Sequence, residues 1–174
     1  MTALHVPRTA PDTGVIDAAK KALGDAILAV KEHAGELTLT VKREEIANVL
    51  KVLRDTAGLE YQQLMEMAGV DYPDRAERFE VVYQLLSLTK NRRIRVKVST
   101  DEATPVPTVT TLWPNAGWLE REVYDMYGVV FEGHPDLRRI LMPDEFTAFP
   151  LRKDYPMRGR GERHNFPAIT RAES

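Results

Sequence analysis

The segment from Phe79 to Val98 restricts the fold of this chain more than any other. Its first part, "FEVVYQLLSL", is rich in β-formers and apolar on both faces over much of its length, which is typical of a central strand. After the turn "TKN", Ile94, Val96 and Val98 alternate with Arg and Lys, which predicts a strand with one solvated cationic face. The two strands are expected to pair as an antiparallel hairpin.

Helical spacing of apolar residues marks further elements. Residues 16–30 and 46–53 carry apolar side chains at three- and four-residue steps, and each stretch is predicted to form an amphipathic helix. Another helix is expected to begin at Asn115, which can cap it, and to end at Gly128. A short helix is expected to open at Pro107, because proline suits the first turn of a helix.

Two more segments are interpreted as strands. Residues 37–41 alternate apolar and polar, as a half-buried strand does. Residues 61–70 fit either a helix or a strand that runs into the turn at 71–73, and the strand is the preferred interpretation. The predicted fold class is α+β, with helices packed on a mixed, largely antiparallel sheet and an extended, loop-rich C-terminal arm.

Loss of periodicity and scattered prolines divide the 174 residues into three parts. Residues 1–13 are expected to be a flexible N-terminus. Residues 14–131 hold the α+β domain. Beyond Gly128 the regular periods fade and prolines recur, so residues 132–174 are expected to form the extended C-terminal arm.

The composition excludes several classes of protein. Cysteine is absent, which removes disulfides, thiolate zinc sites, cysteine nucleophiles and cysteine-ligated iron–sulfur clusters. The formal net charge of -2 gives no overall sign of a nucleic-acid or anionic-membrane partner. No apolar run approaches the ~20 residues that cross a bilayer, and the first residues resemble neither a signal peptide nor a mitochondrial leader. A membrane contact would therefore be made through partners.

Acidic residues and one His gather in the adjoining stretches "WLEREVYDMYG" and "GHPDLRRILMPDE". Oxygen-rich sites with a single His bind Mg, Mn or non-haem iron. One interpretation is therefore a metal site, whose ligands would be Glu122, Asp125, His134 and Asp136. Metal motifs on helices usually place a His three or four residues from its partner, and this spacing is missing. The favoured interpretation is a solvated or partner-facing helix with internal ion pairs.

Basic residues follow at Arg138, Arg139, Arg152 and Lys153. Adjacent arginines can clamp phosphate or carboxylate groups. No GxxxxGK[ST] or strand-linked GxGxxG motif is present, and acidic residues such as Asp154 are interleaved. Pairing with acidic groups of the chain itself or of a neighbouring protein is therefore favoured. Aromatic residues crowd the same region, and Arg with aromatics is typical of interface hot spots.

The stretch "GWLEREVYDMYGVVFEGHPDLRRILMPDEFTAFPLRKDYP", residues 117–156, resembles the signature of the thirty-kilodalton subunit family of respiratory complex I. In bacteria this family carries the letter C among the subunits of NADH–quinone oxidoreductase. The upstream stretch "DYPDRAERFEVVYQLLSLTKNRRIRVKV" is similar to that family too, and the resemblance covers roughly residues 36–158. The signature positions in this sequence are Glu120, Arg121, Glu122, Asp125, Gly133, His134, Arg138, Arg139, Arg152, Lys153 and Asp154.

The resemblance implies a non-catalytic structural subunit in the peripheral arm of proton-translocating NADH–quinone oxidoreductase. That complex moves electrons from NADH through FMN and iron–sulfur clusters to quinone, with these cofactors in partner subunits and none in this chain. It implies that the C-terminal arm docks on the quinone-site subunit, which carries the letter D in bacteria. Arg138 and Arg139 would then pair with acidic groups across or near the interface. The expected place is the cytoplasmic side of the bacterial cell membrane, held there by partner subunits.

Two alternatives stay open. One is a docking subunit of a related membrane-bound hydrogenase. The other is a small metal-dependent hydrolase that uses Glu122, Asp125 and His134.

Overall fold

The computed structural model describes residues 14–161, so the predictions for the N-terminus, 1–13, and for the end of the arm, 162–174, lie outside the described residues. Helices and strands alternate irregularly along the described part, as the α+β class requires. The helices are α1 (Val15–Leu23), α2 (Ile46–Asp55) and α3 (Ala116–Tyr127), with 3-10 turns at Gly24–Ala26 and Arg43–Glu45. The strands are β1 (Ile27–His33), β2 (Glu36–Val41), β3 (Gln63–Asp71), β4 (Phe79–Ser87), β5 (Arg92–Thr100), β6 (Val106–Pro107) and β7 (Phe131–Glu132).

The main sheet has five strands in the order β1-β2-β5-β4-β3. All neighbours are antiparallel except β2 and β5, which run parallel. The predicted hairpin is confirmed, because β4 and β5 pair antiparallel from Phe79 opposite Thr100 to Ser87 opposite Arg92. The strand interpretation of residues 61–70 is also confirmed, since β3 occupies the sheet edge beside β4. The predicted α+β class with a mixed, largely antiparallel sheet is therefore confirmed.

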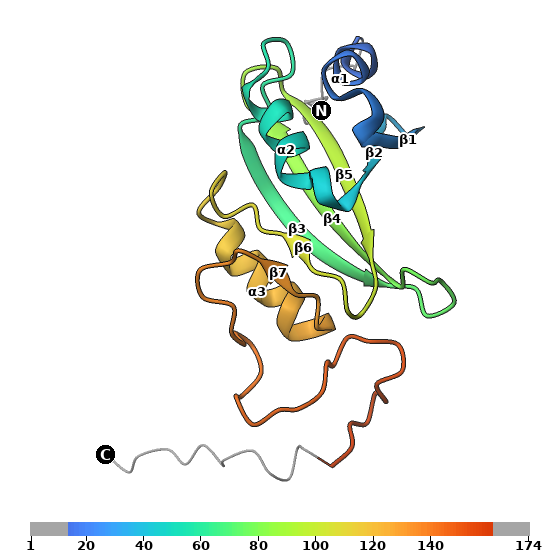
Figure 1. Ribbon diagram of the computed structural model, residues 1–174, viewed down its shortest axis with the longest axis vertical. Helices are drawn as coiled ribbons and strands as arrows, with labels where there is room; N and C mark the ends of the chain where they lie inside the picture. Colours follow the sequence, from blue (N-terminus) through green and yellow to red (C-terminus); the bar gives the residue numbers. More distant parts are fainter. Residues whose placement is uncertain (1–13, 162–174) are drawn as a thin grey trace, which may run out of the picture.

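All three helices cover one face of this sheet (Figure 1). Four residues of α2 at helical spacing are fully buried there: Ile46, Val49, Leu50 and Leu53. Burial of one such side chain stabilises the fold by ~1.5–3 kcal/mol. The other face carries the cations of β5, where Lys97 binds Glu80 at 2.8 Å and Arg95 binds Glu36 at 2.8 Å. The cationic face that alternation predicts is thus confirmed, and part of its charge is neutralised within the chain.

The predicted helix over residues 16–30 is wrong in its second half. Helix α1 ends at Leu23, where Gly24 has φ 49°, and Ile27 and Val30 belong to β1. A bulge near Ala29 shifts the register, so that Ile27 lies opposite Val41 and Val30 opposite Leu39. The extra residue puts Ile27 and Val30 on the same face of the strand despite their three-residue spacing. The bulge therefore imitates helical periodicity.

The helix expected at Pro107 is also wrong. Val106 and Pro107 form β6, which pairs parallel with β7, and Thr108 N–H donates to the carbonyl of Glu132 at 2.9 Å. A distant strand supplies these partners, which no local pattern reveals. Helix α3 is confirmed, and it ends at Gly128, whose φ is 81°. Asn115 precedes the helix without capping it, because its side-chain N–H donates to the carbonyl of Leu64 instead.

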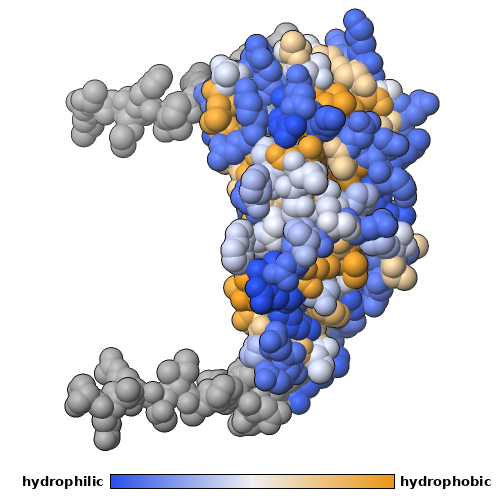
Figure 2. Space-filling view, turned by 60° about the vertical axis from the view of Figure 1, so that its left-hand side comes forward, coloured by the Kyte–Doolittle hydropathy of each residue, from blue (hydrophilic) through white to orange (hydrophobic). Residues whose placement is uncertain are grey.

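The chain after β7 forms turns and bends, with no helix or strand in residues 133–161 (Figure 1). This confirms the loop-rich character of the described part of the arm. It runs below α3 and returns to it, since Leu151 N–H donates to the carbonyl of Met126 at 3.2 Å. Apolar and hydrophilic areas adjoin on the surface at this side of the molecule (Figure 2). The division into domain and arm at residue 131 stays a prediction.

Candidate partner-docking segment

The side chain of Asp125 on α3 organises the arm. It is fully buried, and its Oδ1 accepts a 2.6 Å hydrogen bond from Arg139 Nη1. Its Oδ2 accepts from three consecutive backbone N–H groups, those of residues 140, 141 and 142, at 3.0, 2.7 and 2.8 Å. Burial opposes ionisation, but these donors outweigh it and hold the pKa of the Asp125 carboxyl below its usual range. One carboxylate thereby fixes four residues of the arm onto α3.

Arg139 is fully engaged within its own chain. Besides Asp125, its guanidinium donates to the carbonyl of Ala148 at 3.1 Å and lies 5.3 Å from the ring centre of Phe149. The expectation that Arg139 pairs across an interface is therefore wrong. A buried carboxylate inside the domain satisfies it first, because burying either charge alone is far costlier than burying the pair.

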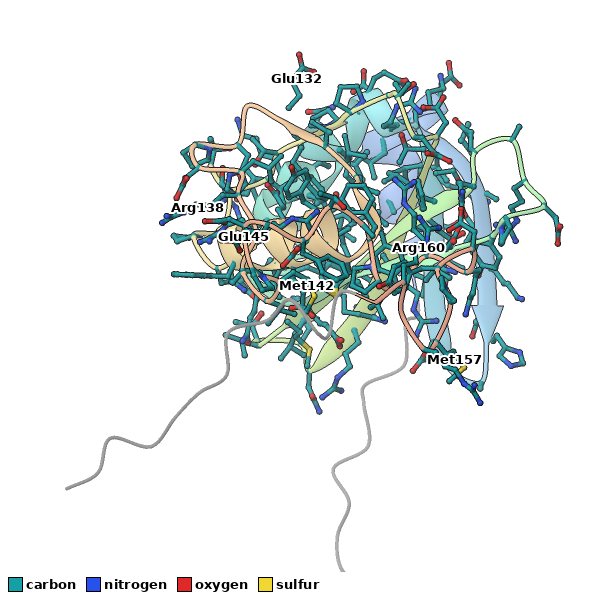
Figure 3. All side chains as sticks on the ribbon, turned by 90° about the horizontal axis from the view of Figure 1, so that it is seen from below. Glu132, Arg138, Met142, Glu145, Met157 and Arg160 are labelled. Atoms are coloured by element: carbon teal, nitrogen blue, oxygen red, sulfur yellow. The ribbon has the colours of Figure 1, made fainter. Side chains whose placement is uncertain are left out.

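Arg138 behaves differently from its neighbour. Its side chain is 69% exposed and meets Asp136 at 3.0 Å, and Figure 3 shows it at the periphery of the arm. Only its backbone carbonyl is used by the domain, as the acceptor of a 3.1 Å bond from Arg121 Nε. Of the adjacent pair, Arg138 alone remains available to a partner.

A second buried carboxylate, Asp71 at the end of β3, holds the arm further along. Arg78 donates to both oxygens of Asp71 at 2.8 and 2.7 Å, and the backbone N–H of Lys153 donates to Oδ2 at 2.7 Å. Arg78 is the main cause that lowers the pKa of the Asp71 carboxyl. Neither Asp71 nor Arg78 was expected from the sequence, because nothing local distinguishes them from other charged turn residues.

The neighbouring signature residues join the same cluster. Arg152 Nε donates to the carbonyl of Tyr127 at 2.7 Å, and Arg152 Nη1 reaches Glu102 at 2.9 Å. Asp154 is 61% exposed and lies 3.4 Å from Arg78 Nη1. The arm is thus tied to the end of α3, to the end of β3 and to the loop after β5.

Glu120 and His134 form a third internal node. Glu120 is fully buried and accepts from the hydroxyl of Thr108 at 2.6 Å and from the backbone N–H of Val109 at 2.7 Å. Burial raises the pKa of its carboxyl, although both hydrogen bonds oppose the shift. His134 Nδ1 accepts from the backbone N–H of Asp136 at 3.0 Å, which assigns the proton of the neutral ring to Nε2, 3.1 Å from the carbonyl of Gly117.

The structure does not bring the four candidate metal ligands together. Asp125 is turned toward Arg139, and His134 lies 3.9 Å from Glu120 rather than beside Glu122. Within residues 14–161 no group of three His, Asp or Glu side chains could hold a metal ion. The hydrolase alternative therefore lacks its site in the described part of the chain. The same residues contain no helix long and apolar enough to span a membrane.

Comparison with known proteins gives one family. The family model described as "Respiratory-chain NADH dehydrogenase, 30 Kd subunit" matches residues 39–161. The C-lettered NADH-quinone oxidoreductase subunit of Novosphingobium aromaticivorans is 62% identical over 160 residues, which are 91% of this chain and 51% of that protein. The protein of the same name from Erythrobacter litoralis is 71% identical over 90 residues, 52% of this chain and 36% of its own length. The matched stretches thus span about half of these curated relatives or less.

A solved structure shares the fold. It belongs to the membrane-bound sulfane sulfur reductase, an archaeal respiratory membrane complex, and superposes with a TM-score of 0.73. The likeness covers 92% of this chain and 94% of that one at 23% sequence identity, so it speaks for the fold alone.

Proposed function

This chain belongs to the family of the 30 kDa subunit of respiratory-chain NADH dehydrogenase, and on that premise we propose that it is a structural subunit of NADH–quinone oxidoreductase, complex I. The complex oxidises NADH and reduces quinone, coupled to proton translocation. This chain contributes assembly contacts in the peripheral arm, and no residue of it takes part in the chemistry. The names of its relatives and the breadth of the family match support this assignment.

The cofactors belong to the partner subunits in this proposal. FMN and the iron–sulfur clusters carry the electrons, and the quinone binds at the quinone-site subunit. The absence of cysteine supports this division, because cysteine-ligated clusters cannot form on this chain. The chain lies on the cytoplasmic side of the bacterial cell membrane and is held there by its partners, without nucleic acid.

The C-terminal arm is the docking element toward the quinone-site subunit. The observation that carries this proposal is that residues 133–161 lack helix and strand yet are anchored by the buried carboxylates Asp125 and Asp71. Long segments without secondary structure are uncommon in compact domains and usually functional. An arm held in one shape before binding loses less conformational entropy when a partner docks.

A pull-down with a tagged copy of the full chain, from membranes in mild detergent, tests the assignment. The expected result is recovery of the quinone-site subunit and the flavin- and cluster-bearing subunits, with NADH-dependent quinone reduction in the eluate. Recovery of the chain alone from the soluble fraction, with a bound divalent metal, would overturn it.

A second candidate is the equivalent docking subunit of another membrane-bound respiratory complex, such as a hydrogenase. The fold shared with a chain of an archaeal respiratory complex favours it. The same eluate separates the two, because such a complex brings down a different catalytic subunit and shows no NADH oxidation.

A further inference from the structure

A groove runs between the edge strand β3 and helix α3, at the side where the arm returns to the helix. Its volume is about 210 Å³. Its floor includes the ring of Tyr127, which packs directly on the backbone of Gly69. Leu151 of the arm borders it and is 50% exposed. The lining residues, called here the β3–α3 groove, are Glu66, Met67, Ala68, Gly69, Leu119, Glu122, Val123, Met126, Tyr127 and Leu151.

Two carboxylates of this groove have no partner. Glu66 and Glu122 are both exposed, and neither forms a hydrogen bond or an ion pair within residues 14–161. No Lys or Arg lines the groove. The other carboxylates of the two elements are Asp71, Glu120 and Asp125, and the chain pairs all of them internally. The groove therefore combines an apolar floor with an uncompensated negative charge.

We propose that the β3–α3 groove binds a segment of a partner subunit that carries an apolar side chain between basic residues. This inference rests on the proposed function and names the surface that it uses. The apolar side chain would lie against Tyr127 and Leu151, and the cations would meet Glu66 and Glu122. Unpaired charges facing opposite charges across an interface direct association and select the partner.

Other ligands fit the groove less well. Small-molecule sites commonly enclose about 300–1,000 Å³, and this groove is smaller. An anionic lipid surface attracts basic segments, and two free carboxylates would oppose it. A protein segment with Lys or Arg beside an apolar residue meets both the shape and the charge.

An exposed aromatic extends the same surface. Trp118 is 63% exposed and precedes Glu122 by four residues, so the two share one face of α3. The guanidinium of Arg121 lies 5.0 Å from its ring centre, which holds the indole against the helix surface. Trp and Arg are the residue types that dominate binding hot spots.

Photocrosslinking in the assembled complex tests the proposal. A photoreactive phenylalanine analogue replaces Leu151 in the full chain, and the matched control carries it at Leu88, which is 64% exposed in the turn after β4. Illumination is expected to join position 151, and not position 88, to a partner-subunit segment with Lys or Arg within a few residues of the attachment point.

Charge reversal provides the second arm. The double variant E66K/E122K is expected to lower the yield of that adduct about tenfold, in the manner of lost interfacial charge pairs. The control E132K reverses a carboxylate that Figure 3 shows projecting away from the body, and it should leave the yield unchanged. The purified double variant should unfold at the wild-type temperature, because neither Glu has a partner within the described chain.

The outcomes separate the two proposals. A complete complex with an adduct on an acidic segment, on residues 162–174 or on a second copy of this chain overturns the groove inference alone. So does an adduct that resists E66K/E122K, or no adduct at position 151. Failure to recover any partner subunit overturns the proposed function and the groove with it.

Discussion

The carboxylate of Asp71 and the backbone N–H of Lys153, 82 residues apart in the chain, are joined by a 2.7 Å hydrogen bond. Arg78 binds the same carboxylate through two nitrogens. The arm is therefore fastened to the end of an edge strand by a charge that lies inside the domain. Asp125 and Arg139 repeat this arrangement at the other anchoring point.

Removing Arg139 should destabilise the domain itself. Arg139→Ala leaves the buried Asp125 carboxylate without its cation, and breaking a buried pair costs about 3–5 kcal/mol. We expect about 3 kcal/mol, since the three backbone N–H donors remain. Urea unfolding of the purified chain measures it, with Arg138→Ala as the matched control at an exposed position. Equal stability of the two variants would contradict the role of the Asp125 pair.

Asp71 should contribute to the acid dependence of stability. Its folded-state pKa is lowered, with Arg78 as the main cause, so its contribution is complete above the unfolded-state pKa of ~3.9. The contribution is lost as the pH falls through the lower folded-state pKa. Asp71→Asn is therefore expected to flatten the free energy of unfolding against pH between about pH 2 and 5. An unchanged slope in chemical denaturation would speak against it.

Glu120 should act with the opposite sign. Burial raises its pKa in the folded state, so its contribution is present below the unfolded-state pKa of ~4.3 and is lost as the pH rises through the folded value. In Glu120→Gln this loss is absent, and the variant should be most similar to the wild type at acid pH. Denaturation from pH 4 to 7 tests this, and a difference that shrinks with rising pH would refute it.

Gly69 is required for the contact between β3 and α3. A Cβ added there would lie 2.5 Å from Cδ2 of Tyr127, so the ring must move. Overpacking of this kind costs about 1–3 kcal/mol, which Gly69→Ala should show in thermal or urea unfolding. Gly117→Ala is the control, because its Cβ would make ordinary contacts of 3.7 Å or more in the first turn of α3. A neutral Gly69→Ala would mean that Tyr127 does not pack on this strand.

Gly128 combines backbone strain with crowding. Its φ is 81°, and a Cβ would lie 2.6 Å from Arg152 Nη2 and 2.7 Å from the Phe149 ring. Gly128→Ala should cost more than Gly35→Ala, where φ is 78° but nothing lies within 4 Å. The strain alone costs about 1 kcal/mol. The excess, read from paired unfolding curves, reports the packing of the arm, and equal losses would deny it.

Elements defined by local pattern could be predicted. The β4–β5 hairpin follows from strict alternation, and α3 from its apolar spacing and Gly128, since a residue with positive φ ends a helix. The prediction failed where a long-range partner decided. The bulge near Ala29 and the pairing of β6 with β7 depend on strands that the local sequence does not display.

The candidate site divides in the same way. Its charged residues could be located from the sequence, but not their partners, and Arg139 was assigned to an interface although Asp125 satisfies it. Asp71 and Arg78 escaped notice altogether. Only after these internal pairs are accounted for do Glu66 and Glu122 stand out as unpaired.

The sequence by itself determined the family, the fold class and the ends of the strongly periodic elements, because periodicity and turn residues act within a few positions. The tertiary structure decided which charges are buried and paired, and hence which remain for a partner. A carboxylate that loses water must recruit donors from whatever part of the chain lies beside it. In this protein those donors come from residues up to 82 positions away.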